Sequence, residues 1–164
     1  LLGENAEVRL NGLYALEEAQ HADHQTFVEH IAPACSSREV YKGMLDGTSH
    51  GVFNGKVFVH PEAQKTDGKQ TNKALLLSEG ARVDSKPQLE IFADDVKCTH
   101  GATVGRLDET ALFYMKSRGI GGERARALLT YAFAAEVLEL IELEPLKIAL
   151  EASLFARFMQ AEQV

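Results

Sequence analysis

Two patterns of hydrophobic and polar positions divide the chain near residue 107. Before that point, short β-prone runs alternate with Gly, Asn, Asp and Ser. The clearest runs are 25–31, 51–53, 56–60, 74–77 and 88–92. Short β-prone runs between turn residues are typical of all-β proteins. We therefore predict a β-rich body over residues 1–107.

The hydrophobic pattern alone leaves two β architectures open. Asn11-Gly12 and Asn54-Gly55 are pairs that type I′ turns prefer, and they favour an antiparallel sandwich built from hairpins. The runs nevertheless vary in length, and several are apolar at consecutive positions, which is typical of a stacked solenoid such as a parallel β-helix. No strict repeat length is present, so periodicity does not decide between sandwich and solenoid.

The glycine content changes sharply after Gly122, and residues 108–164 are predicted to form a helical subdomain. All 13 glycines lie at or before Gly122. A short helix is expected from Asp108 to Ser117, because the acidic residues at its start suit the positive end of a helix. Residues 119–122 contain three glycines and are expected to form a break and hinge.

Two longer helices are expected after this hinge. From Glu123 onward, apolar residues recur at i, i+3, i+4 and i+7, which is the spacing of an amphipathic helix. Pro145 is expected to end or kink the first helix near residue 143, because the residue before a proline avoids the helical region. The apolar side of the second helix is predicted to carry Leu146, Leu150, Leu154, Phe158 and Met159. The short connection predicts that the two helices pack antiparallel.

Composition excludes several classes of protein. The chain has 164 residues, with 17 Lys and Arg against 24 Asp and Glu, so its net charge is −7. This acidic balance argues against a general nucleic-acid binder, which needs clustered positive charge. No run approaches the roughly 20 apolar residues that cross a bilayer, so no membrane association is expected. With only two cysteines a disulfide framework is excluded, and a reducing compartment is the simpler interpretation.

The most distinctive local sequence is the segment 94–105, which contains Cys98 and His100. If the segment is extended, the two side chains share one face, because strand side chains alternate. A thiolate beside an imidazole can bind a metal or form a nucleophile–base pair. A buried thiol next to a hydrogen-bonded histidine is the structural alternative. Gly101 and Gly105 predict tight turns, so the β-body is expected to end here.

Other candidate sites carry weaker signals. His21 and His24 are spaced i, i+3 and would form a metal-binding pair if they lay on a helix, although solvent-exposed histidines are the alternative. Asp94 and Asp95 are adjacent, so on a strand they point to opposite faces and cannot serve one substrate as glycosidase carboxylates do. The sequence also has no phosphate-binding loop, dinucleotide fingerprint or nucleophile elbow.

Several segments closely resemble the SufD family, which supplies a subunit of the Suf system for iron–sulfur cluster assembly. The likeness is carried by residues 81–91, 96–105 and 112–120, with further support from 51–57 and 70–78. The resemblance implies a mainly β fold, namely part of a right-handed parallel β-helix followed by a C-terminal α-helical subdomain. It also implies that the chain, which begins Leu1-Leu2-Gly3, lacks the N-terminal region of the family.

The same resemblance implies a non-catalytic scaffold in the bacterial cytoplasm. Such a subunit pairs with the paralogue SufB through the β-helix and docks the ATPase SufC through the helices. Its cargo would be iron or a transient iron–sulfur cluster at the SufB–SufD interface, with nothing tightly bound in the isolated chain. Cys98 and His100 correspond to the family's Cys-x-His-Gly element and become candidate ligands. The partner-binding candidates are Phe113, Tyr114, Arg118, Tyr131 and Phe133.

Three alternatives remain beside this interpretation. Parallel β-helices also serve as carbohydrate-binding or lyase modules, although a chain without Trp offers few sugar-stacking platforms. A second alternative is a homodimeric structural protein that associates through exposed strand edges. Finally, the C-terminal helices could simply cap the open end of a solenoid rather than dock a partner that moves them about the hinge at residues 119–122.

Overall fold

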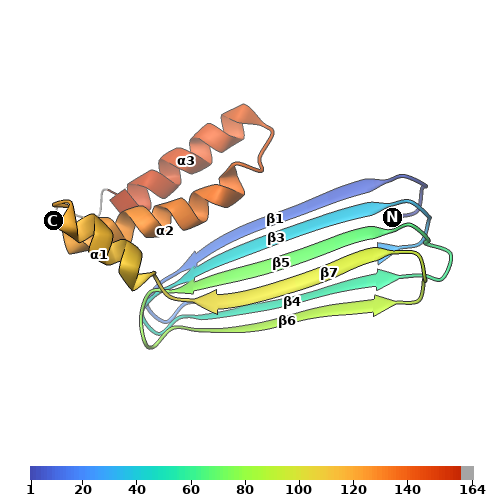
Figure 1. Cartoon of the computed structure of the whole chain (residues 1–164), viewed down its shortest axis with the longest axis horizontal. Coiled ribbons are helices and arrows are strands. Elements are labelled where there is room, and N and C mark those ends of the chain that lie inside the picture. The colour runs from blue at the N-terminus through green and yellow to red at the C-terminus, as the bar shows by residue number, and fades with distance from the viewer. Residues whose placement is uncertain (160–164) are drawn as a thin grey trace.

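The computed structural model describes residues 1–159, which form seven strands followed by three helices (Figure 1). The strands are β1 (Glu7–Leu16), β2 (His21–His30), β3 (Ser36–Leu45), β4 (His50–Val59), β5 (Asp67–Leu76), β6 (Arg82–Ile91) and β7 (Lys97–Gly105). The odd-numbered strands form one sheet in the order β1-β3-β5-β7, and the even-numbered strands form a second in the order β2-β4-β6. Every pairing between strands is parallel.

The chain is therefore a parallel β-solenoid, as the family resemblance implies. It alternates between the two sheets, so three full coils are followed by the single strand β7. Leu10, Glu39, Gln70 and His100 occupy one register position in successive odd strands, and each coil therefore takes about 30 residues. Parallel ladders exclude the antiparallel sandwich that periodicity had left open.

The two Asn-Gly pairs do not form hairpin turns, contrary to the expectation from their sequence. Gly12 lies in the middle of β1 and Gly55 in the middle of β4. A Cβ on Gly12 would collide with the Tyr41 ring, and a Cβ on Gly55 would lie 2.7 Å from Phe53 Cζ. These glycines are needed because large side chains fill the narrow interior beside them. Gly101 likewise lies inside β7 rather than in a turn.

The interior of the solenoid contains two apolar clusters. One cluster joins Val28, Val57, Val59, Ala63 and Ala93, with Cys98 packed against its margin. The other joins Tyr14, Leu45, Ala74 and Ala81. Buried polar side chains of β3 and β5 lie at the register positions between them, among them Glu39, Gln70 and Asn72, which are 1–2% exposed. The core is thus apolar toward both ends of the strands, and its middle combines these polar side chains with the fully buried Phe53 ring.

The three helices are α1 (Glu109–Ser117), α2 (Gly122–Leu138) and α3 (Glu144–Met159). The expected end of the first helix is confirmed, since Gly119 follows it with a φ of 83°. The second helix ends at Leu138, five residues before the predicted position near 143. Pro145 does not end it but lies in the first turn of α3, where a missing backbone N–H costs nothing.

Helices α2 and α3 run antiparallel and lie on the outer face of the β1-β3-β5-β7 sheet (Figure 1). A third apolar cluster forms there, in which Met44 and Leu75 of the sheet pack against Ala134, Leu138 and Leu154 of the helices. The helices therefore do not cap the open end of the solenoid, which excludes the capping alternative. Within residues 1–159, no helix is long and apolar enough to span a membrane.

A buried lysine fastens α2 to the sheet. The Lys42 side chain on β3 is 3% exposed, donates a 2.9 Å hydrogen bond to the Phe133 carbonyl and pairs with the Glu136 carboxylate. Its ammonium also lies 4.4 Å from the centre of the Phe133 ring. The contact with Lys42 holds the pKa of Glu136 below its usual range. A lysine this deeply buried requires such partners, so the attachment of α2 is specific.

Candidate metal-ligand edge

Within residues 1–159, the second sheet ends at β6 and supplies no strand opposite β7, which leaves the inward face of β7 uncovered. The inward positions of β7 are set by register with β5: Gly68 pairs with Cys98, Gln70 with His100, Asn72 with Ala102 and Ala74 with Val104. All four β5 residues are buried, whereas on β7 only Cys98 is half-buried and the other three are exposed. We call the row formed by Cys98, His100, Ala102 and Val104 the open edge.

Cys98 and His100 share the open edge, as their spacing predicts. Two residues along a strand separate their Cα atoms by about 6.6 Å. The thiol lies against Gly68, where an added Cβ would be 3.3 Å from its sulfur. His100 is exposed and projects from the next position of the same face. The structure thus presents one thiol and one imidazole side by side at an uncovered surface.

The open edge can supply only part of a metal site. Among the described residues no three His, Cys, Asp or Glu side chains are grouped closely enough to hold a metal ion. Burial raises the pKa of the Cys98 thiol. A backbone hydrogen bond from Gly68 lowers this pKa in part, and the nearby charge of Asp67 raises it again, so the net shift is upward. The thiolate that iron prefers is therefore disfavoured in this chain by itself. His100 is the other candidate ligand on this edge.

Cys98 should react slowly with alkylating reagents because its thiol pKa is raised. Since only the thiolate reacts, we expect iodoacetamide modification at pH 8 to be several-fold slower than in the same protein unfolded in denaturant. The rate should keep rising above the pH at which an ordinary thiol levels off. Mass mapping of Cys98 over pH 7–10 measures this, with Cys35, 1% exposed, as the internal unreactive control. A rate at pH 8 equal to that of the unfolded chain would contradict the prediction.

His21 and His24 do not form the metal-binding pair that a helix would have allowed. Both lie in strand β2, where an i, i+3 spacing sends the side chains to opposite faces. His24 stacks on Tyr14 at 4.6 Å between ring centres, whereas the exposed His21 lies beside His50. The helix on which the pairing depended is a strand.

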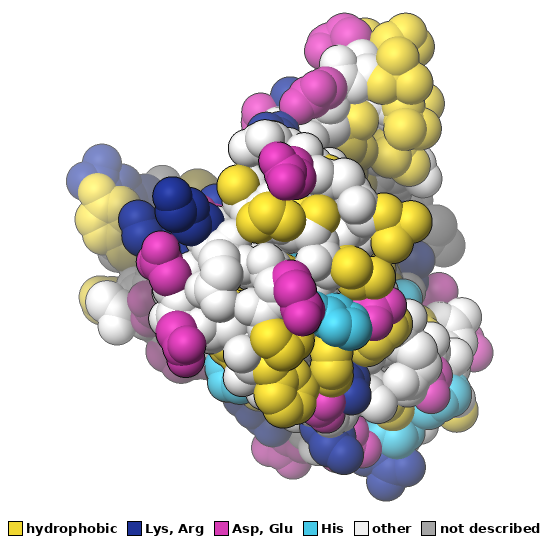
Figure 2. All heavy atoms as spheres, turned by 90° about the vertical axis from the view of Figure 1, so that its right-hand side faces the viewer, with side chains coloured by type: hydrophobic (Ala, Val, Ile, Leu, Met, Phe, Trp, Pro, Cys, Tyr) yellow, Lys and Arg dark blue, Asp and Glu magenta, His cyan; other side chains and the backbone are white. Residues whose placement is uncertain are grey.

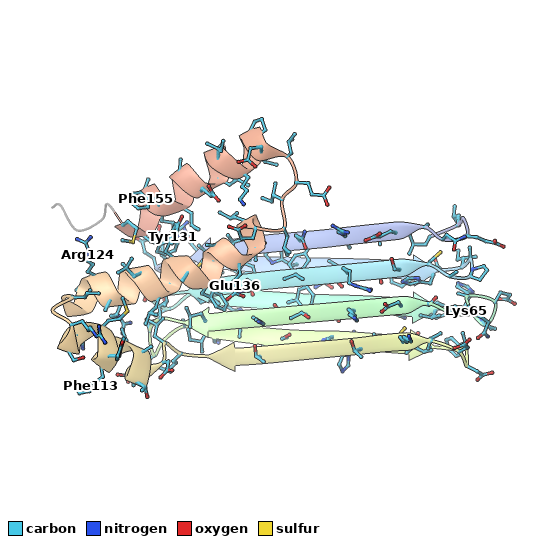
Figure 3. All side chains as sticks on the ribbon, turned by 45° about the horizontal axis from the view of Figure 1, so that its top comes forward. Lys65, Phe113, Arg124, Tyr131, Glu136 and Phe155 are labelled. Atoms are coloured by element: carbon cyan, nitrogen blue, oxygen red, sulfur yellow. The ribbon has the colours of Figure 1, made fainter. Side chains whose placement is uncertain are left out.

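The structure divides the five partner-binding candidates into two groups. Phe113 and Tyr114 on α1 are 72% and 57% exposed, and Arg118 donates a 2.6 Å hydrogen bond to the Tyr114 hydroxyl. Tyr131 and Phe133 on α2 are half-buried against the cluster between helices and sheet. Tyr131 meets the Phe155 ring of α3 edge-on, while Phe113 points away from the molecule (Figure 3). Only the first group is free to contact another protein.

A further apolar surface lies on α3, which sequence periodicity assigned to the interior. Leu154 is buried and Phe158 half-buried as expected, but Leu146 and Leu150 are 46% and 39% exposed. Leu143, just before α3, is 62% exposed on the same side, whereas Ile148, which is 56% exposed, lies on the opposite side of the helix. Figure 2 shows hydrophobic side chains gathered on the part of the molecule that rises above the solenoid. The apolar face of α3 is therefore longer than the surface that covers it.

Fold and site together define a class of protein: a parallel β-solenoid with a thiol and an imidazole side by side on β7 and a helical hairpin on one face. Comparison with known sequences identifies the family within this class. The chain belongs to the SufBD family, because the model of the SUF system FeS cluster assembly SufBD core domain matches residues 1–133.

Named relatives agree with this assignment. The chain is 47% identical to the iron–sulfur cluster assembly protein SufD of Escherichia coli, over 90% of this chain and 35% of that protein. It is 41% identical to an iron–sulfur cluster assembly SufBD family protein of Mycobacterium leprae, over 85% of this chain and 38% of the relative. SufD of Bacillus subtilis is 36% identical over 74% of this chain and 28% of its own length. The chain thus spans about a third of the length of these relatives.

Proposed function

We propose that this chain is the part of an iron–sulfur assembly scaffold that meets both partner subunits. The open edge pairs with a SufB-like paralogue, and the helices dock a SufC-like ATPase. Iron or a nascent cluster is the cargo. His100 is the first candidate to hold it, and Cys98 the second, where the open edge meets the paralogue. The scaffold itself is non-catalytic and works in the cytoplasm of its bacterial host. Family membership supports this role.

The observation that carries the proposal is the incompleteness of the open edge. One imidazole and one raised-pKa thiol cannot saturate an iron centre, which takes four or more ligands in proteins. Among the described strands, β7 is the edge of its sheet, so its backbone groups on the free side can pair with another strand. A second polypeptide that covers β7 would supply both missing ligands and missing backbone partners.

The paralogue contact can be tested by placing a charge on the open edge. Val104 is 52% exposed on the inward face of β7, so Val104→Lys puts an ammonium where the partner strand packs. We expect the dissociation constant for the SufB-like partner to rise at least tenfold, because an unpaired buried charge is costly. Titration calorimetry with the full-length proteins measures this.

Thr103→Lys is the matched control, since Thr103 is exposed on the opposite face of the same strand. It should leave affinity for the partner within about threefold. Equal affinity for both variants, or a full-length protein that forms homodimers and ignores the paralogue, would refute pairing through this edge.

A further inference from the structure

Buried polar side chains lead through the solenoid directly to the open edge. Glu39 and Gln70 are 2% and 1% exposed, and they occupy the same register position in β3 and β5. Gln70 Nε2 donates a 2.6 Å hydrogen bond to Glu39 Oε2. A carboxylate only accepts hydrogen bonds, so this contact fixes which end of the Gln70 amide faces Glu39. The carbonyl oxygen Gln70 Oε1 is left at the other end.

That oxygen has no hydrogen-bond donor anywhere in the described part of the chain, although it is fully buried. An unsatisfied buried acceptor costs about 1–3 kcal/mol. Gln70 Nε2 lies close to the backbone of Gly55, in the space that a Cβ on Gly55 would occupy. Gln70 is therefore a buried side chain with one acceptor to offer.

The next residue in this register is His100. Gln70 pairs with His100 in the β5–β7 ladder, and parallel strands lie about 4.8 Å apart with paired side chains on the same face. The ladder Glu39, Gln70, His100 thus ends on the only one of its members that is exposed. An imidazole has a ring N–H that suits an amide oxygen, and a metal-binding histidine usually donates its second nitrogen to such an acceptor.

We propose that Gln70, held in place by Glu39, is a positioning residue for His100. Gln70 Oε1 accepts a hydrogen bond from one ring N–H of His100, and the lone pair of the other ring nitrogen is thereby directed out of the open edge, toward the partner. This inference rests on the proposed function, in which His100 binds iron. The hydrogen bond selects one tautomer and holds the ring at the open edge. Glu39 contributes by keeping the amide from presenting its NH₂ group, which would repel a ring N–H.

The test compares Gln70→Met with Asn72→Leu in the full-length protein bound to its paralogue partner. Asn72 is the matched control because it is also 1% exposed, lies two residues along β5 and gives its amide to Ser85, but its β7 neighbour is Ala102. Anaerobic Fe(II) titration measures iron affinity. Nitrogen NMR of labelled histidine reads the tautomer of His100.

We expect Gln70→Met to weaken Fe(II) binding about 10–100-fold and to give mixed His100 tautomers. Asn72→Leu should leave both unchanged. If both variants behave alike, or if Gln70→Met binds Fe(II) like the parent, the inference is wrong. If Gln70→Met fails to fold, Glu39→Gln provides the test. This variant no longer fixes the orientation of the Gln70 amide, so it is expected to give mixed His100 tautomers. Loss of iron binding in His100→Ala is required first; if His100→Ala binds iron normally, the proposed function of the site fails instead.

Discussion

We expect His100→Ala to abolish cluster loading in the assembled complex while the protein stays folded. His100 is exposed, so its removal should cost no more than the hydrogen bond to Gln70 Oε1, about 1–3 kcal/mol, which is less than the stability of a typical domain. The open edge would then keep only Cys98, whose raised thiol pKa makes it a poor ligand. We expect bound iron and sulfide after anaerobic reconstitution to fall at least tenfold below the parent complex.

The control is His21→Ala, which removes another exposed histidine from a strand of the same solenoid. It should load clusters like the parent. Cys98→Ala should lose less than His100→Ala, because the half-buried thiol with its raised pKa contributes less to binding. Normal loading of the His100→Ala complex would show that this edge does not hold the cargo, even though the family assignment stands.

The sequence predicts the local elements of this fold better than their assembly. Burial alternates along β4 and β5 with period two, and the helical half shows its 3.6-residue spacing, so both classes of element were readable. Parallel pairing was not readable, because it depends on residues about 30 positions apart. Gly12 and Gly55 were misleading for the same reason: their neighbours Tyr41 and Gln70 come from other coils. Only the family resemblance carried that long-range information.

The candidate site shows a similar division. The shared face of Cys98 and His100 follows from strand geometry alone. The burial of Glu39 and Gln70 does not, since charged and amide side chains usually lie at the surface. The sequence likewise could not predict that Lys42 attaches α2 to the sheet, because its partners Phe133 and Glu136 lie more than 90 residues away. Side chains that act across coils are found only when the coils are stacked.

The attachment of α2 also limits which residues can dock an ATPase. Phe133 packs beside Lys42 and Tyr131 beside Phe155, so removing either ring loosens the helix rather than a partner contact. Large exposed apolar side chains remain on α1 and on the uncovered part of α3. Since α2 is fastened to the sheet, a movement about residues 119–122 would reorient α1 against α2 more easily than α2 against the solenoid.

Phe113→Asp should therefore disrupt ATPase binding without unfolding the protein. Phe113 is 72% exposed, and an aromatic anchor at the centre of an interface is commonly worth 2–4 kcal/mol, so the dissociation constant should rise about 30–1000-fold. Phe27→Asp is the matched control, because Phe27 is 59% exposed on strand β2, away from the helices. Titration of the full-length variants with the SufC-like ATPase, alongside thermal unfolding, measures both properties. Tight binding by Phe113→Asp, or equal losses for both variants, would show that the ATPase docks elsewhere.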